Sequence, residues 1–533
     1  MKPHFEFSLN KKNLLLITMG SWFCWGLLTG AGQESSLRWP DLFADTESYS
    51  FFHYIRDMGI YLLASFMLFL LPGLLWGNIF SKRQYRTSEL LAVAFIISLA
   101  LLVVITTLFK VGAARELQSW DLLLMLLGVT GGGLLVCLKK DGWENRNIVT
   151  IPWADFYLCL ALLLCLIIAG WGLRERILWV EYDRDVSPER ILAIPFGYQE
   201  DVLESFGLIH SLKTHVLPYW DLEYAERYGY SIVDPPLRIF ISFFLMLFGG
   251  ESFAVQSLNT LLVLMLSFLA VARLATVGLD VRPYRSFWLI PVLFLNVIFV
   301  FLWHRDFALV LIDHIHVMSL FVVAQFYFLL TGRYRLFLAF AVLAFLTKFE
   351  AALFTLAGLW FYGRILQPDY RTAVDLFKKY ILLVSPYIVM MFTIGFLRGD
   401  LGVYAEAFCV ERFVRLDHFY FFDEIFPQEL TSPWEAFSLA ATGEFFIQFL
   451  MGTAFGGVLI FLSTQDKISR FLRRIGLFYL ILVLASRAKR IHYISPLVLI
   501  SAIIVLRMFF LTSWEDIRGK LRVFSRKLRL PRL

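Results

Sequence analysis

Runs of about 18–22 mostly apolar residues recur along the whole of this chain, and no other feature of the sequence limits its fold so strongly. A helix of about 20 apolar residues spans the hydrocarbon core of a bilayer and satisfies its own backbone hydrogen bonds there. Of the 533 residues, 59% are hydrophobic and 17% are charged. Soluble domains carry about 25% charged residues, so we exclude an ordinary soluble enzyme and a disordered chain. The expected fold is all-α: a polytopic integral membrane protein with about 13–14 transmembrane helices.

The apolar runs also give the approximate boundaries of the spans. The first run lacks a small-residue cleavage site after it, so we expect it to be retained as a span. We expect a short basic cytoplasmic tail at 512–533 and no appended soluble domain. The expected spans lie near 13–30, 57–79, 88–110, 120–138, 153–173, 252–275, 286–303, 314–331, 334–347, 350–364, 380–397, 445–463, 475–486 and 493–511.

The distribution of lysine and arginine predicts the orientation of these spans. With the N-terminus inside, about 30 of the 49 Lys and Arg residues fall on the cytoplasmic side, as the positive-inside rule requires. This placement explains the net charge of +6 without nucleic acid as a partner. The opposite side then carries two long loops, 174–251 and 398–444, both rich in aromatic and acidic residues. We therefore expect the chemistry on the external side.

An acid pair lies at the start of an expected helix in loop 174–251. Glu200 and Asp201 precede Val202, Phe206 and Ile209, which recur at helical spacing. The helix dipole stabilises the ionised form of a carboxylate at this position, as a general base requires. The same acids would also serve as a plain helix cap, and that alternative stays open.

Two proline motifs follow in the same loop. Pro218-Tyr219-Trp220-Asp221 comes first, and Asp234-Pro235-Pro236 then starts a second expected helix, Leu237 to Phe248, along the membrane surface. The loop aromatics are expected to form an interfacial belt, with sugar stacking as the alternative. These aromatics are Tyr219, Trp220, Tyr224, Tyr228 and Tyr230.

The order of these motifs resembles the first external loop of the GT-C glycosyltransferases, the superfamily of protein O-mannosyltransferases and lipid A aminoarabinose transferases. There the loop has an acid pair, a P-Y motif, a K-P-P motif and a helix that ends in L-F-G. Two later segments, Leu346-Thr347-Lys348 and Arg490 to Pro496, resemble the family's L-T-K-G and R-Y-x-x-P segments. The resemblance covers about 153–511. It implies a GT-C-like catalytic core at 151–511, which includes loop 174–251, after an added unit of transmembrane helices at 1–150.

The resemblance implies an enzyme of the EC 2.4 class that moves a sugar from a polyprenyl-phosphate donor to a glycan, lipid or protein acceptor on the external face. The resemblance also implies a location in a bacterial cytoplasmic membrane, where membrane lipids surround the protein and the active site faces the periplasm. The leaving phosphate needs cations, and the acceptor must lose a proton to a carboxylate. The implied catalytic residues are Asp201, with Glu200 beside it, and Asp313. The implied phosphate ligands are Lys348, Arg487, Lys489, Arg490 and Arg238, and the implied sugar or acceptor contacts are Tyr219, Trp220, Asp234, Asp306 and His492.

Several of these residues admit a plainer interpretation. No cofactor is expected, because no Gly-rich phosphate loop stands in a strand context. A divalent metal at Asp313, His314 and His316 is less favoured than a polar span end, because further ligand spacing is lacking. Lys348 beside Glu350 would also make a structural ion pair. The cations Arg487, Lys489 and Arg490 would also mark an ordinary loop.

The sequence departs from the family pattern at three points. Asp234 stands where the aminoarabinose transferases carry a lysine, which leaves Arg238 as a substitute, and Phe349 stands where glycine is usual. Four spans precede the one before loop 174–251. An alternative catalytic loop, 31–56, ranks lower because it is short and lacks the Pro-Pro helix; its acids are Asp41, Asp45 and Glu47.

Two other functions stay open. A transporter or flippase for a lipid-linked sugar also needs charges within spans, but it predicts inverted repeats, which the sequence does not show. A non-catalytic scaffold of envelope assembly would tolerate loss of the acids.

Overall fold

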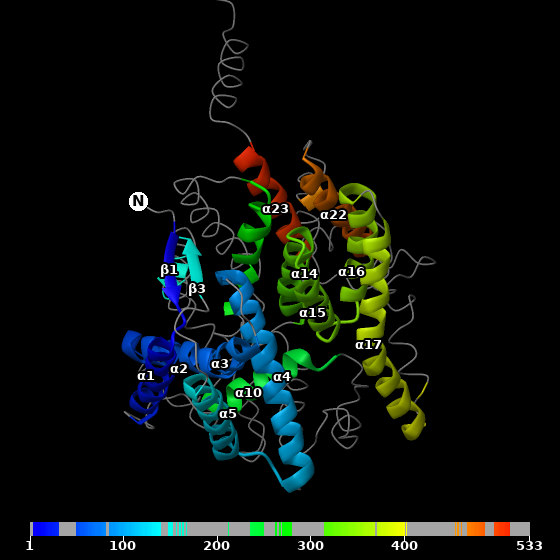
Figure 1. Ribbon diagram of the computed structural model, residues 1–533. Helices are drawn as coiled ribbons and strands as arrows, with labels where there is room; N and C mark the ends of the chain where they lie inside the picture. Colours follow the sequence, from blue (N-terminus) through cyan, green and yellow to red (C-terminus); the bar gives the residue numbers. More distant parts are fainter. Residues whose placement is uncertain are drawn as a thin grey trace, which may run out of the picture.

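The fold is given by a computed structural model of the full chain (Figure 1). The structure describes residues 4–30, 50–80, 85–113, 115–139, 148–152, 235–249, 269–279, 314–367, 370–399, 466–485 and 495–511, with single positions between 156 and 167, at 212, between 262 and 267, at 401 and between 454 and 460.

Helices make up nearly all of the described chain. In chain order they are α1 (Lys11–Gly30), α2 (Phe51–Phe69), α3 (Leu71–Phe80), α4 (Thr87–Ala113), α5 (Ser119–Lys139), α10 (Leu237–Gly249), α14 (His314–Leu330), α15 (Tyr334–Phe345), α16 (Ala351–Phe361), the π-helical turn η5 (Tyr362–Leu366), α17 (Tyr370–Arg398), α22 (Lys467–Ala485) and α23 (Ser495–Leu511). Four helical stretches are long and apolar enough to cross a membrane: Tyr54–Gly77, Glu89–Ala113, Ser119–Lys139 and Tyr370–Leu397. The helical class is confirmed for these residues, while the total of 13–14 spans stays a prediction.

Most of the expected spans that can be compared coincide with observed helices, but α17 and α22 begin earlier than expected, and the expected span 57–79 is divided between α2 and α3. α1, α4, α5, α14, α15 and α23 begin and end within a few residues of the expected limits, and α10 begins at Leu237, as the double proline predicts. The expected spans 153–173, 252–275, 286–303 and 445–463 lie wholly or largely outside the described residues.

One small sheet is a departure from the expected all-α fold. β1 (His4–Ser8) pairs antiparallel with β3 (Ile148–Pro152), and β2 (Tyr85–Arg86) pairs parallel with β3, which lies in the centre. β1 immediately precedes α1, β2 immediately precedes α4, and β3 follows α5. The sheet therefore gathers three segments that the positive-inside rule assigns to one side of the membrane.

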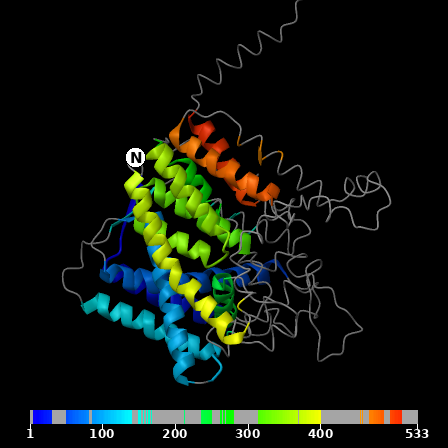
Figure 2. The same ribbon diagram turned by 90° about the vertical axis from the view of Figure 1, so that its right-hand side faces the viewer.

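The helices pack in two groups. α14 to α17 pack with α22 and α23, whereas α1 to α5 pack with one another and with α10. Figure 1 shows the second group, in blue and cyan with α10 in green, below and beside the first. The quarter-turn view in Figure 2 shows α22 and α23 side by side at one end of the first group.

Contacts between distant segments respect the two sides that the sequence predicts. Arg333 Nε lies 2.7 Å from Glu89 Oε1, and both residues belong to the expected inner side. Leu237 N donates to Leu346 O at 3.0 Å, and both belong to the expected outer side. A chain whose spans alternate in direction requires contacts of this kind, between segments on the same side of the membrane. Which side is cytoplasmic stays a prediction.

A buried arginine ties three segments together at the expected inner side. Arg507, in α23, is 1% exposed, and its Nε lies 2.5 Å from Asp466 Oδ2. Its Nη1 donates to the carbonyls of Ala275 and Val277 at 3.0 and 2.6 Å. Asp466 also accepts the backbone N–H of Ser469 at 2.9 Å, so it caps the start of α22 as well. One carboxylate thus stabilises both a helix start and a buried cation.

Close packing of α3 on α4 depends on a glycine, and this predicts a destabilising substitution. Gly73 N donates to the buried Ser98 Oγ at 2.8 Å, and a Cβ at Gly73 would overlap the Ala94 carbonyl oxygen. We expect Gly73→Ala to lower the free energy of unfolding by about 1–3 kcal/mol, because two backbones must separate. Thermal unfolding of the purified protein measures this.

The matched control is Gly128→Ala in α5, where a new Cβ meets no atom within 4 Å. At this position alanine should raise the midpoint of thermal unfolding slightly, since glycine destabilises a helix by about 1 kcal/mol relative to alanine. Equal effects at the two positions would contradict the α3–α4 packing.

Candidate functional site

The start of α10 contacts the turn between α15 and α16. Leu237 is the first residue of α10, and the first N–H groups of a helix have no partner within the helix. Its N–H donates instead to the carbonyl oxygen of Leu346, at 3.0 Å. Pro235 and Pro236 are buried at the same place. The Pro-Pro motif and the Leu346-Thr347-Lys348 motif, far apart in the sequence, therefore meet in space.

The turn that carries Lys348 is held by local hydrogen bonds. Thr347 Oγ1 donates to Leu343 O at 2.8 Å, and Lys348 N donates to Ala344 O at 3.0 Å. Lys348 is 5% exposed, and its Nζ lies 3.5 Å from Glu350 Oε1. The Glu350 side chain is 25% exposed, so solvent still reaches the acid of this pair. A buried ammonium group of this kind needs anionic partners.

Arg238 supplies a second buried cation next to this turn. It follows Leu237 in the first turn of α10 and is 9% exposed. Its guanidinium makes no ion pair or hydrogen bond with any residue that the structure describes. Arginine binds carboxylate or phosphate through paired N–H groups, so an anion would satisfy this side chain. Arg238 and Lys348 are thus two buried cations on the two segments that the hydrogen bond from Leu237 to Leu346 joins.

Phe349, which departs from the family pattern, has a packing role. Its ring lies 5.3 Å from that of Phe345 and 6.3 Å from that of Tyr387, in α17. The aromatic cluster fixes the turn against α17, and a glycine at this position could not make these contacts. Phe349 therefore helps to hold the turn that carries Lys348.

The N-terminal helices also contact α10. The Trp25 ring stacks on the Phe248 ring with centroids 4.2 Å apart. Lys110 Nζ lies over the Phe243 ring, 5.1 Å from its centroid, and donates to the carbonyl oxygen of Leu212. Residues 1–150 therefore pack directly on the helix that carries Arg238. Lys110 was not among the predicted site residues, although a lysine at the expected outer end of a span is unusual enough to single it out.

Most of the other predicted site residues lie outside the described residues. His314 and His316 lie in the first turn of α14, and the structure does not describe their side chains. No group of three or more His, Cys, Asp or Glu side chains that could hold a metal occurs among the residues described, so the metal alternative stays untested. The predicted residues outside the description are Glu200, Asp201, Tyr219, Trp220, Asp234, Asp306, Asp313, Arg487, Lys489, Arg490 and His492, together with Asp41, Asp45 and Glu47 of the alternative loop.

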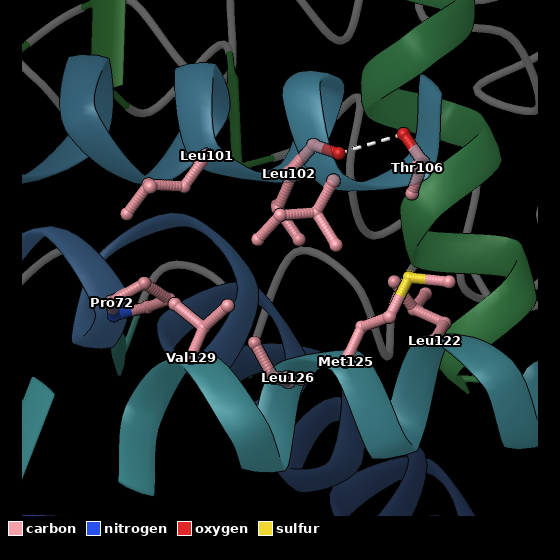
Figure 3. Close-up of a pocket in the computed structure, with 9 residues that line it drawn as sticks. Pro72, Leu101, Leu102, Thr106, Leu122, Met125, Leu126 and Val129 are labelled. Atoms are coloured by element: carbon pink, nitrogen blue, oxygen red, sulfur yellow. Dashed lines mark hydrogen bonds between the residues drawn. The ribbon is translucent and has the colours of Figure 1, made fainter. Parts of the chain in front are cut away.

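A cavity between α3, α4 and α5 has the wrong chemistry for a sugar phosphate. It is lined by Pro72, Leu101, Leu102, Ile105, Thr106, Leu122, Met125, Leu126 and Val129 (Figure 3). Its one hydroxyl, on Thr106, donates to the Leu102 carbonyl at 2.7 Å and is thereby satisfied. With no charged side chain in its lining, this cavity does not suit an ionised substrate.

Comparison with known proteins found no relative: no family model, no curated protein and no solved structure matches the chain. The described residues define a helical protein with four candidate membrane spans and a buried cationic junction beside α10.

Proposed function

We propose that this chain is a membrane glycosyltransferase that moves a sugar from a polyprenyl-phosphate donor to an acceptor on the external face of the membrane. The observation that carries the proposal is the hydrogen bond from Leu237 to Leu346. It joins the Pro-Pro helix to the Leu346-Thr347-Lys348 turn, and Arg238 and Lys348 follow closely after the two bonded residues in the sequence. A lipid-borne phosphate at this junction would meet both buried cations.

The chemistry follows from the charges that the reaction moves. The acceptor oxygen or nitrogen attacks the anomeric carbon and forms the new glycosidic bond, and the bond from that carbon to the phosphate oxygen breaks. The electron pair leaves with the phosphate, where Lys348 and Arg238 stabilise the negative charge. The acceptor's proton passes to a carboxylate, which we assign to Asp201. Arg487, Lys489 and Arg490 are the further proposed phosphate ligands, and Asp313 is the second proposed acid.

The surroundings of the junction support a lipid donor. α10 is a 13-residue apolar helix, and its buried aromatic face packs on helices that are apolar enough to cross a membrane. A polyprenyl chain could then lie among hydrocarbon while its phosphate reaches the cations. The contacts of Trp25 and Lys110 with α10 support a role for residues 1–150 in holding that helix.

The experiment that tests the function is mass spectrometry of glycans, glycolipids and glycoproteins of the cell envelope, with and without the gene. We expect one sugar of defined mass to be missing from one acceptor class in the deletion strain, and to return with the wild-type gene. An envelope with unchanged glycosylation would contradict the proposal. Accumulation of the acceptor alone would not separate a transferase from a flippase, so purified protein must also perform the transfer in detergent.

Lys348→Met is expected to weaken binding of polyprenyl phosphate about 10–100-fold, because a charged hydrogen bond contributes about 1.5–3 kcal/mol. Native mass spectrometry of the detergent-solubilised protein, titrated with polyprenyl phosphate, measures the binding. The control is Lys379→Met, which removes an exposed lysine paired with Asp375 at 2.7 Å. Unchanged affinity in the Lys348 variant would remove this residue from the phosphate site.

A further inference from the structure

An exposed aromatic and basic surface lies at the end of α16, away from the junction just described. Arg364 stacks over the Trp360 ring, with its Cζ 5.3 Å from the ring centroid. The Trp360 and Tyr370 rings meet edge to face, with centroids 6.1 Å apart. Trp360 is 54% exposed and Tyr370 is 38% exposed. We call Trp360, Arg364 and Tyr370 the η5 platform.

Hydrogen bonds of Tyr362 hold the turn that carries the platform. The Tyr362 and Tyr334 hydroxyls lie 3.0 Å apart, and Gln367 Nε2 donates to the Tyr362 hydroxyl at 2.9 Å. Gln367 N donates to Tyr362 O at 3.1 Å, which closes the wide π-helical turn. A Cβ at Gly363 would lie 3.3 Å from the Tyr370 ring, so glycine allows Tyr370 to pack against the turn. The platform is thus organised before any ligand binds.

The charges around the platform favour an anionic ligand. The acids Glu89, Asp375 and Asp466 already have basic partners, in Arg333, Lys379 and Arg507. The cations Arg335, Arg364, Lys378, Arg470 and Arg474 are exposed on the segments of this expected inner side. A guanidinium that stacks on an aromatic ring keeps its N–H edge directed outward, where it can bind two oxygens of a phosphodiester.

We propose that the η5 platform binds the headgroup of an anionic phospholipid of the inner leaflet. Arg364 binds the phosphodiester, and the Trp360 and Tyr370 rings lie at the level of the glycerol and headgroup, where amphipathic aromatics are favoured. α17 begins at Tyr370 and continues through the membrane-spanning stretch that ends at Leu397, so a lipid on the platform would lie along this helix. This binding is independent of the proposed transfer reaction on the opposite side.

The test measures phosphatidylglycerol binding to the full-length protein by native mass spectrometry, with phosphatidylcholine as the neutral lipid. We expect wild type to prefer phosphatidylglycerol and Arg364→Gln to bind it about fivefold more weakly, since one basic residue near an anionic surface contributes that much. Trp360→Ala should weaken binding as well. The control, Lys139→Gln, removes an exposed lysine of the same expected side from the end of α5 and should bind phosphatidylglycerol as wild type does.

Three results would overturn the proposal. The first is an Arg364→Gln variant that binds as tightly as wild type. The second is an equal loss in Lys139→Gln, which would indicate diffuse attraction and no defined site. The third is equal thermal stabilisation of the detergent-solubilised wild type by inorganic phosphate and by phosphatidylglycerol. That result would show that the ligand is a free anion.

Discussion

Asp201→Asn is expected to reduce sugar transfer by about 10²–10⁴-fold while expression and lipid binding stay unchanged. A positioned general base contributes this factor, and asparagine keeps the size of the side chain but cannot take a proton. The measurement is the amount of transferred sugar in the envelope of a deletion strain that expresses the variant. Full activity of the variant would remove Asp201 from catalysis, and it would return the flippase and the scaffold to consideration.

The control for this experiment lies in the same loop. Glu204→Gln changes an acid one helical turn later in the expected helix. It should keep most of the activity if the effect belongs to the carboxylate at position 201. Glu200→Gln tests the neighbouring acid, where we expect a smaller loss than at Asp201.

Asp466→Asn is expected to lower the free energy of unfolding by about 3 kcal/mol, because it leaves the buried Arg507 without its counter-charge. Asparagine still caps a helix, so the start of α22 should persist and the loss should report the ion pair. The double variant Asp466→Asn/Arg507→Met should regain much of the stability, since it removes the buried charge as well. Asp375→Asn, in the exposed pair with Lys379, should cost less than about 0.5 kcal/mol.

The same pair predicts how stability depends on pH. Burial raises the pKa of Asp466, but hydrogen bonds from Arg507 and Ser469 outweigh it, and the net pKa lies below the ordinary value. The pair therefore stabilises the protein above the unfolded pKa of about 3.9, and this contribution is lost as the pH falls through the folded pKa. We expect the difference in thermal midpoint between wild type and Asp466→Asn to shrink below about pH 4. A difference that does not change with pH would contradict the assignment.

Apolar length predicted the helices well, but it predicted their starts less well. α17 begins ten positions before the expected residue 380, and α22 begins eight before the expected residue 475. Both extensions are amphipathic and charged. A hydropathy criterion therefore leaves them out of the predicted span, although the helix runs through them. The capping residue Asp466 was a readable signal for the start of α22. The short strands were missed because two to five residues in polar connections carry almost no periodic signal.

The candidate site was predictable in its residue types and only in part in its geometry. The Pro-Pro motif predicted the start of α10. The ion pair of Lys348 with Glu350, which was the plainer alternative for this lysine, is present at 3.5 Å, and the role of Lys348 as a phosphate ligand stays a prediction. The contact of Leu237 with Leu346 joins distant segments, and no local pattern encodes such a pairing. Arg507 was missed as well. An arginine within a span requires a partner, but the sequence does not show that the partner is Asp466.

The most direct measurement is a cryo-electron microscopy structure of the full chain with bound polyprenyl phosphate. We predict phosphate density within hydrogen-bonding distance of Lys348 or Arg238, and the Asp201 carboxylate within about 15 Å of Lys348, which one sugar phosphate can bridge. Phosphate bound elsewhere, or Asp201 farther than this from the cations, would contradict the proposed catalytic site.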